Sequence, residues 1–129
     1  MIALFGELGT GKTELVRGFV GEMVRSPSFT LHNIYSNGFR VHHFDLFRLE
    51  PPVDPDQVGL TEVLAQNDGC VFVEWADRLS WLPDERIDIA FSFRTENQRA
   101  LEMACHLPWF DAEGFVEFLN ENSFRYEIY

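Results

Sequence analysis

The sequence predicts an α/β fold in which a central sheet lies between flanking helices in three layers. An apolar run at Ile2 to Phe5 ends in a glycine-rich turn, and apolar residues at helical spacing follow it. A second apolar run, Cys70 to Val73, is bounded by Gly69 and Glu74, which is typical of a buried parallel strand. Alternating strands and helices favour a layered α/β architecture. The 129 residues are enough for one domain with its own core, and we treat 1–129 as that domain.

The first helix is predicted over Glu14 to Val24. Its apolar residues recur at helical spacing and are Leu15, Val16, Phe19, Val20 and Met23. The segment Ser26-Pro27-Ser28 ends this helix, because proline disfavours helical geometry in the residue before it.

Two strands, Phe29 to Tyr35 and Phe39 to Phe44, are predicted next. Ser36-Asn37-Gly38 lies between them, and Asn-Gly between β-prone runs is a strong hairpin signal. We expect a loop over Pro51 to Pro55 and a short helix over Gln57 to Leu64.

The last third of the chain predicts a second hairpin and a final helix. Apolar and polar residues alternate from Ile87 to Phe93 and again from Leu101 to Leu107, with a polar turn at Thr95 to Gln98. Asp111 to Asn122 is amphipathic, with Phe115, Phe118 and Leu119 on one helical face.

Composition excludes several classes of protein. The formal net charge is −11, which disfavours direct binding to a nucleic-acid backbone. No run approaches the ~20 apolar residues that a membrane span needs. The two cysteines, Cys70 and Cys105, lie in apolar strand-like runs, and we expect buried thiols in a reducing cytoplasm rather than a disulfide.

The turn after the first strand has the pattern of a phosphate-binding loop. Residues 6–13 read Gly-Glu-Leu-Gly-Thr-Gly-Lys-Thr and fit G-x-x-x-x-G-K-[ST] without a mismatch. Glycines let the backbone N–H groups approach phosphate oxygens, and the helix that follows adds its positive N-terminal end. Lys12 is expected to reach the β- and γ-phosphates, and the Thr13 hydroxyl to bind Mg²⁺. The nucleotide-binding residues predicted here are Glu7, Leu8, Gly9, Thr10, Gly11, Lys12 and Thr13.

Hydrolysis of a nucleotide needs acidic groups beyond this loop. Glu74 follows the apolar run Cys70 to Val73, and Asp45 follows the run Val41 to Phe44. A carboxylate at the end of such a strand lies at the carboxyl edge of the sheet, where the loop also lies. Together with the loop, the two acids are candidates for a metal ligand and a water-positioning group. Each alone is equally compatible with an ordinary exposed acid.

Four blocks in fixed order resemble the bacterial TsaE (YjeE) family, the P-loop ATPases needed for threonylcarbamoyladenosine formation in tRNA. Residues 6–13 form the first block. The others are Ser26-Pro27-Ser28-Phe29-Thr30-Leu31, His43-Phe44-Asp45-Leu46-Phe47-Arg48-Leu49 and Glu74-Trp75. The resemblance covers residues 1–107 and leaves 108–129 as a C-terminal helix and tail without a family motif. It implies a P-loop NTPase-like sheet that lacks the family's usual N-terminal strand and helix.

The resemblance also implies a role for each matching residue. Lys12 and Asp45 become catalytic candidates, with Asp45 orienting or deprotonating water. Glu74 joins Thr13 as a metal ligand, Trp75 lies beside the nucleotide, and Thr30 belongs to a switch-like loop. The implied cofactors are ATP and Mg²⁺, and the implied partners are the TsaD and TsaB proteins. Contact with tRNA is expected only through these partners, in the cytoplasm.

Two other functions stay open from the residues alone. Glu14 stands where the family usually has threonine and adds negative charge near the phosphates, which favours a nucleotide-binding interaction protein without hydrolysis. A P-loop small-molecule kinase would need a lid with several arginines, and the sequence has no such cluster. For His43, a structural hydrogen bond is the expected role.

Overall fold

The computed structural model describes residues 1–21, 24–36, 38–123, 125 and 127. Along these residues the helices and strands follow the order that the sequence predicts. Their bounds are β1 Ile2–Phe5, α1 Lys12–Val20, β2 His32–Ser36, β3 Arg40–Asp45, α2 Leu60–Gln66, β4 Gly69–Glu74, the 3₁₀ helix η1 Ala76–Arg78, β5 Ile87–Thr95, β6 Gln98–Cys105 and α3 Ala112–Glu121.

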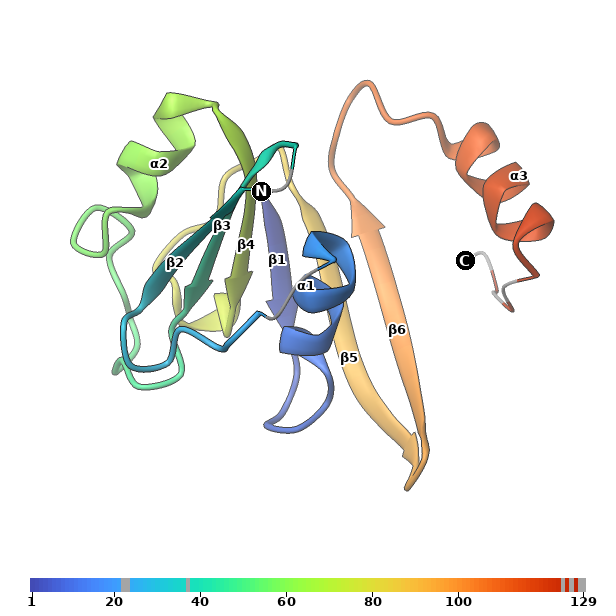
Figure 1. The fold of residues 1–129 in the computed structure, drawn as a ribbon, viewed down its shortest axis with the longest axis horizontal. Helices are drawn as coiled ribbons and strands as arrows, with labels where there is room; N and C mark the ends of the chain where they lie inside the picture. Colours follow the sequence, from blue (N-terminus) through green and yellow to red (C-terminus); the bar gives the residue numbers. More distant parts are fainter. Residues whose placement is uncertain (22–23, 37, 124, 126, 128–129) are drawn as a thin grey trace.

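The described strands form one mixed sheet in the order β2-β3-β4-β1-β5-β6 (Figure 1). The central strands β3, β4, β1 and β5 run parallel, while β2 and β6 pair antiparallel at the two edges. Both predicted hairpins are confirmed, although Asn37 of the first turn lies outside the described residues. In this register Asp45 at the end of β3 pairs with Glu74 at the end of β4. The parallel strands therefore bring the two predicted acids to one edge of the sheet.

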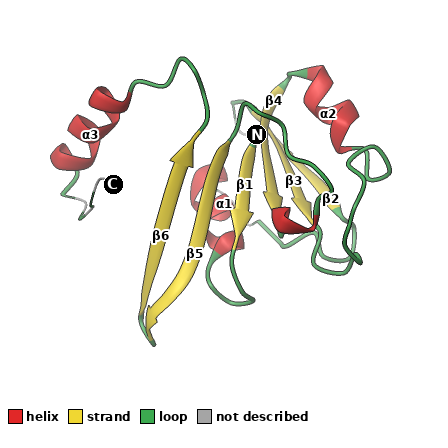
Figure 2. Ribbon diagram, turned by 180° about the vertical axis from the view of Figure 1, so that it is seen from behind, coloured by secondary structure: helices red, strands yellow, loops and turns green. Residues whose placement is uncertain are grey.

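Two apolar clusters cover opposite faces of the sheet, so the predicted three-layer arrangement is confirmed. Helix α1 lies in front of the sheet in Figure 1 and behind it in Figure 2. Its buried Val16 and Val20 pack with strand residues Leu4 and Phe72. On the other face, the residues that pack together are Ala3, Phe44, Leu46, Val53, Leu60, Val63, Val71, Val73, Ala76 and Leu79.

Several predicted boundaries were wrong. Helix α1 ends at Val20 rather than Val24, because Gly21 adopts a left-handed conformation with φ 74° and its N–H closes on the Arg17 carbonyl. Met23 of the predicted helix lies outside the described residues. The strand predicted from Phe29 begins at His32, since Leu31 has φ 68° and donates its N–H to the Pro27 carbonyl in a turn.

Helix α2 begins at Leu60 rather than Gln57. Turns occupy residues 57–59, and Gly59, with φ 74°, directly precedes the helix. The second hairpin also ends earlier than predicted, because β6 stops at Cys105.

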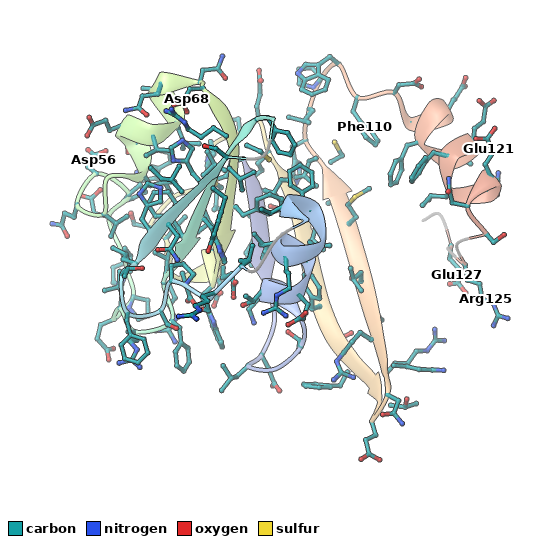
Figure 3. The ribbon with its side chains drawn as sticks, viewed as in Figure 1. Asp56, Asp68, Phe110, Glu121, Arg125 and Glu127 are labelled. Carbon is teal, nitrogen blue, oxygen red and sulfur yellow. The ribbon has the colours of Figure 1, made fainter. Side chains whose placement is uncertain are left out.

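Helix α3 stands clear of the sheet beyond β6 (Figures 1 and 2). It begins after Asp111, whose side chain accepts a hydrogen bond from the Gly114 N–H, and none of its described side chains is buried. Acidic residues are spread over the molecule: Asp56 and Asp68 lie on the α2 side, and Glu121 and Glu127 lie at the far end (Figure 3). Within the described part of the chain, no helix has the length and apolar character to cross a membrane.

Candidate nucleotide-binding site

The loop between β1 and α1 is shaped by glycine backbone conformations that other residues rarely adopt. Gly6 has φ +135°, and a Cβ there would lie 2.6 Å from the Phe91 carbonyl oxygen. Gly11 has φ +108° and directly precedes the first helical residue, Lys12. The buried Thr10 hydroxyl donates to the Glu7 carbonyl at 2.8 Å and closes the loop. The N-terminus of α1 therefore lies beside the carboxyl end of β1, as phosphate binding requires.

Lys12 is folded back into this loop. The residue is 4% exposed, and Nζ donates to the carbonyls of Gly6 at 2.6 Å and Glu7 at 2.8 Å. Nζ also lies 4.4 Å from the centre of the Trp75 ring, within the range of a cation–π contact. Burial lowers the pKa of Lys12, and the nearby carboxylates of Glu74, Asp45 and Asp77 oppose that shift. The ammonium is thus held at the loop by neutral carbonyls, which a phosphate can replace.

Glu74 connects the loop helix to the sheet. It ends β4, where it pairs with Leu4 of β1 on one side and Asp45 of β3 on the other. Its Oε1 accepts a 2.7 Å hydrogen bond from the Thr13 hydroxyl and lies 2.7 Å from His43 Nε2. Glu74 is 3% exposed, so a carboxylate is held in a largely dehydrated position directly beside the first turn of α1.

Asp45 is also buried and held at both oxygens. Oδ2 accepts a hydrogen bond from the Ser26 hydroxyl at 2.5 Å, and Oδ1 accepts the Phe47 N–H at 2.9 Å. Its backbone N–H donates to the Leu31 carbonyl, which ties the end of β3 to the segment before β2. Asp45 is therefore fixed by the Ser26 segment on one side and by its own turn on the other.

These groups line one open pocket of about 430 Å³. The lining residues are Leu8, Gly9, Gly11, Lys12, Thr13, Glu14, Ser26, Ser28, Asp45, Phe47, Arg48, Glu74 and Trp75. Both predicted strand-end acids, the loop lysine and Trp75 thus meet at one surface, although up to 63 positions separate them in sequence.

The sequence matches the model of the family described as "Threonylcarbamoyl adenosine biosynthesis protein TsaE" over residues 1–101. The chain belongs to the TsaE family. Three proteins named "tRNA threonylcarbamoyladenosine biosynthesis protein TsaE" are similar to it. The Nostoc protein is 34% identical over 120 residues, covering 80% of this chain and 68% of its own. The Bacillus subtilis protein is 32% identical over 108 residues, covering 78% and 66%. The Treponema pallidum protein is 30% identical over 110 residues, covering 81% of each chain.

A solved structure supports the same fold. The crystal structure of YdiB from Bacillus subtilis superposes with a TM-score of 0.63 at 24% identity, covering 95% of this chain and 77% of that one. The matches to the Nostoc and B. subtilis TsaE proteins span about two thirds of the length of those relatives.

The donor atoms of this TsaE pocket suit a magnesium ion that is bound together with phosphates. Thr13, Glu74 and Asp45 offer hydroxyl and carboxylate oxygens, the ligand type that Mg²⁺ prefers. Both hydrogen bonds described for the Glu74 carboxylate fall on Oε1, which leaves Oε2 for a cation. Among the described residues, no three His, Cys, Asp or Glu side chains gather closely enough to hold a metal by themselves. Magnesium here would therefore take its remaining ligands from phosphate and water.

Three further predicted site residues are Trp75, Thr30 and Glu7. Trp75 lines the pocket with a left-handed backbone, φ 59°, and its ring contacts both Lys12 and Arg78. Thr30 lies apart from the pocket lining: it is exposed, and its hydroxyl donates to Asn33 Oδ1 at 2.8 Å. Glu7 contributes through its carbonyl, which accepts from both Thr10 and Lys12.

Sequence reasoning missed part of this site. Ser26 and Ser28 line the pocket, where Thr30 was the expected residue of their block. Phe47 and Arg48 also line it, and the Arg48 guanidinium lies 3.9 Å from the centre of the exposed Phe29 ring. The sequence block that starts at Ser26 indicated that this segment belongs to the site. Only the fold shows that Ser26, rather than Thr30, reaches Asp45.

Proposed function

We propose that this TsaE chain binds ATP with Mg²⁺ and hydrolyses it as an accessory protein of tRNA threonylcarbamoyladenosine formation. One observation carries the proposal. Lys12 and Thr13 at the start of α1 face Glu74 and Asp45, which are paired at the ends of adjacent parallel strands. A cation, a hydroxyl and two carboxylates arranged around a phosphate-binding loop match the needs of phosphoryl transfer to water.

Phosphate binding would use groups already in place. The N–H groups of residues 7–13 and the N-terminal end of α1 supply a local positive field. Lys12 Nζ would exchange the carbonyls of Gly6 and Glu7 for β- and γ-phosphate oxygens. Because burial makes the charged lysine less favourable, pairing it with a phosphate relieves that cost.

The acidic residues divide between the cation and the water. The Thr13 hydroxyl and Glu74 Oε2 would hold Mg²⁺, which when bound neutralises phosphate charge. Asp45 would orient a water against the γ-phosphorus and accept its proton as the bond to the leaving oxygen of ADP breaks. In the present arrangement Asp45 Oδ2 is bonded to Ser26. Water binding therefore requires Asp45 to share that oxygen between the serine and the water.

The partners that we propose are TsaD and TsaB, with tRNA reached only through them, in the cytoplasm. Three family relatives carry names from this pathway, which is the reason to place the chain there. The net charge of −11 supports contact with proteins rather than direct contact with RNA. Slow turnover by the isolated chain is expected, because a partner protein commonly completes the site of such ATPases.

The test is Mg²⁺-dependent hydrolysis of ATP and GTP, measured with and without purified TsaB and TsaD. We expect partner-stimulated ATP turnover that is lost in Lys12→Ala and Asp45→Asn. Asp56→Asn, an exposed acid on the α2 side, serves as the matched control and should keep wild-type turnover (Figure 3). Partner binding by a folded protein with no hydrolysis would favour the interaction protein instead, and phosphate transfer to a metabolite would favour the kinase.

A further inference from the structure

His43 occupies a position directly behind the proposed metal ligand. Its side chain is fully buried in β3, where it pairs in register with Asn33 of β2 and Phe72 of β4. Its Nε2 lies 2.7 Å from Glu74 Oε1, the same oxygen that accepts the Thr13 hydroxyl. His43 from β3 and Thr13 from α1 thus both contact the same carboxylate oxygen of Glu74 in β4.

The chemistry of this contact sets the direction of its hydrogen bond. A carboxylate oxygen only accepts hydrogen bonds, so Nε2 carries the proton and donates it. The other ring nitrogen, Nδ1, is buried without a hydrogen-bond partner among the described residues. An unpartnered buried nitrogen is unfavourable for folding. The unpartnered Nδ1 adds nothing to stability, so the role of the ring lies in the contact of Nε2 with the Glu74 carboxylate.

We propose that His43 is a positioning residue for Mg²⁺, an inference that rests on the proposed function. By holding Oε1 of Glu74, His43 keeps Oε2 available to the cation and keeps the Thr13 hydroxyl directed at the same site. The contact makes Glu74 ready for the metal before nucleotide arrives. Groups that hydrogen-bond to a metal ligand act in this way: they orient the ligand and do not contact the ion themselves.

The chain provides a matched control in the next residue. His42 is 2% exposed, but it lies on the opposite face of the same strand. Both of its nitrogens have partners: Nδ1 lies 3.0 Å from His32 Nε2, and Nε2 lies 2.9 Å from Asp68 Oδ1. Replacing His42 removes a buried imidazole from β3 without touching Glu74.

The test compares four variants of the full chain by calorimetric titration with ATP, once with MgCl₂ and once with EDTA. The quantity measured is the ratio of the two dissociation constants, so it requires no turnover. His43→Gln keeps an N–H donor near the place of Nε2, while His43→Asn is too short to reach Glu74 and His43→Leu has no donor. His42→Gln is the control, and thermal unfolding confirms that each variant is folded.

We expect the gain in ATP affinity that Mg²⁺ provides to fall roughly tenfold to a hundredfold in His43→Leu and His43→Asn. Their affinity for ATP in EDTA should be unchanged. His43→Gln and His42→Gln should keep the gain. If His43→Leu does not fold, the comparison of His43→Gln with His43→Asn tests the inference. The inference is overturned if the Asn variant keeps the wild-type ratio, or if Gln, Asn and the His42 control all lose it equally. A wild-type chain with no Mg²⁺-dependent gain would instead overturn the proposed function.

Discussion

The Thr13 hydroxyl donates a 2.7 Å hydrogen bond to Oε1 of Glu74, which lies 61 residues further along the chain. This contact joins the first turn of α1 to the end of β4 and brings the two proposed metal ligands together. Because β4 lies between β1 and β3, Glu74 is also adjacent to Asp45. The position of one strand in the sheet therefore sets the geometry of the whole pocket.

Replacing Gly6 with alanine should destabilise the fold. The new Cβ would meet the Phe91 carbonyl at 2.6 Å in a backbone conformation, φ +135°, that alanine disfavours. We expect a loss of roughly 2–3 kcal/mol in the free energy of unfolding, measured by urea denaturation. Gly9→Ala is the control: its φ is +78°, but no atom lies within 4 Å of the added carbon. Its expected cost is only about 1 kcal/mol. Equal losses in the two variants would show that the Phe91 contact is unimportant.

Ser26→Ala should slow hydrolysis without weakening nucleotide binding. The serine donates to Asp45 Oδ2 at 2.5 Å and so helps to fix the carboxylate that we assign to water. A loosened Asp45 is expected to lower kcat roughly tenfold to a hundredfold. The affinity for ATP, measured by calorimetry, should be unchanged. Ser28→Ala lines the same pocket and contacts Ser26 rather than Asp45, so it should retain kcat. A raised Kd for ATP with unchanged kcat in Ser26→Ala would contradict this role.

The fluorescence of Trp75 should report the movement of Lys12. Nζ lies 4.4 Å from the ring centre in the present arrangement and must turn toward phosphate when nucleotide binds. In a Trp81→Phe, Trp109→Phe background, ATP is expected to change the Trp75 emission. The same titration in Lys12→Met, carried to saturating ATP, should produce a much smaller change, because no ammonium leaves the ring. An equal change in emission in both proteins would show that the change does not come from the contact between Lys12 and Trp75.

Stability should fall on mild acidification because of His32. Burial, followed by the nearby rings of His42 and His43, lowers the pKa of His32 below its ordinary 6.5. Below pH 6.5 the unfolded chain takes up a proton that the folded chain resists, so the free energy of unfolding decreases toward the folded pKa. His32→Gln should reduce the loss measured by urea denaturation between pH 7.5 and pH 5.5. His106→Gln, a half-exposed histidine paired with Asp88, controls for general acid effects. A loss in His32→Gln as large as in wild type would exclude this origin.

The strand-end acids and the loop were predictable because their signals are local. The apolar run before Glu74 places this acid at the end of a strand. The glycine-rich pattern that ends in Thr13 places the loop at a turn before a helix. The end of α1 was predicted too late, since helical spacing continues past Gly21 while the backbone does not. Ser26 was missed for a different reason. Its contact with Asp45 depends on how the segment before β2 crosses the end of β3, which no local pattern indicates.

The contact of His43 with Glu74 was predictable only in part. A structural hydrogen bond was expected for this residue from the sequence, and the structure supplies Glu74 as its partner. Alternation along β3 predicts that His42 and His43 face opposite sides of the sheet. Only the order of the strands reveals that the side occupied by His43 also carries Glu74, whereas that of His42 leads to His32 and Asp68.

The central claim is that this pocket binds ATP through Lys12, and its most direct test is calorimetric titration of ATP in MgCl₂. Wild type should bind one ATP per chain, and Lys12→Ala should lose at least roughly tenfold in affinity, because a charge-assisted contact to phosphate is removed. Arg40→Ala, an exposed residue at the start of β3 that pairs with Asp68, should bind as wild type does. Wild-type affinity in a folded Lys12→Ala variant would contradict the account.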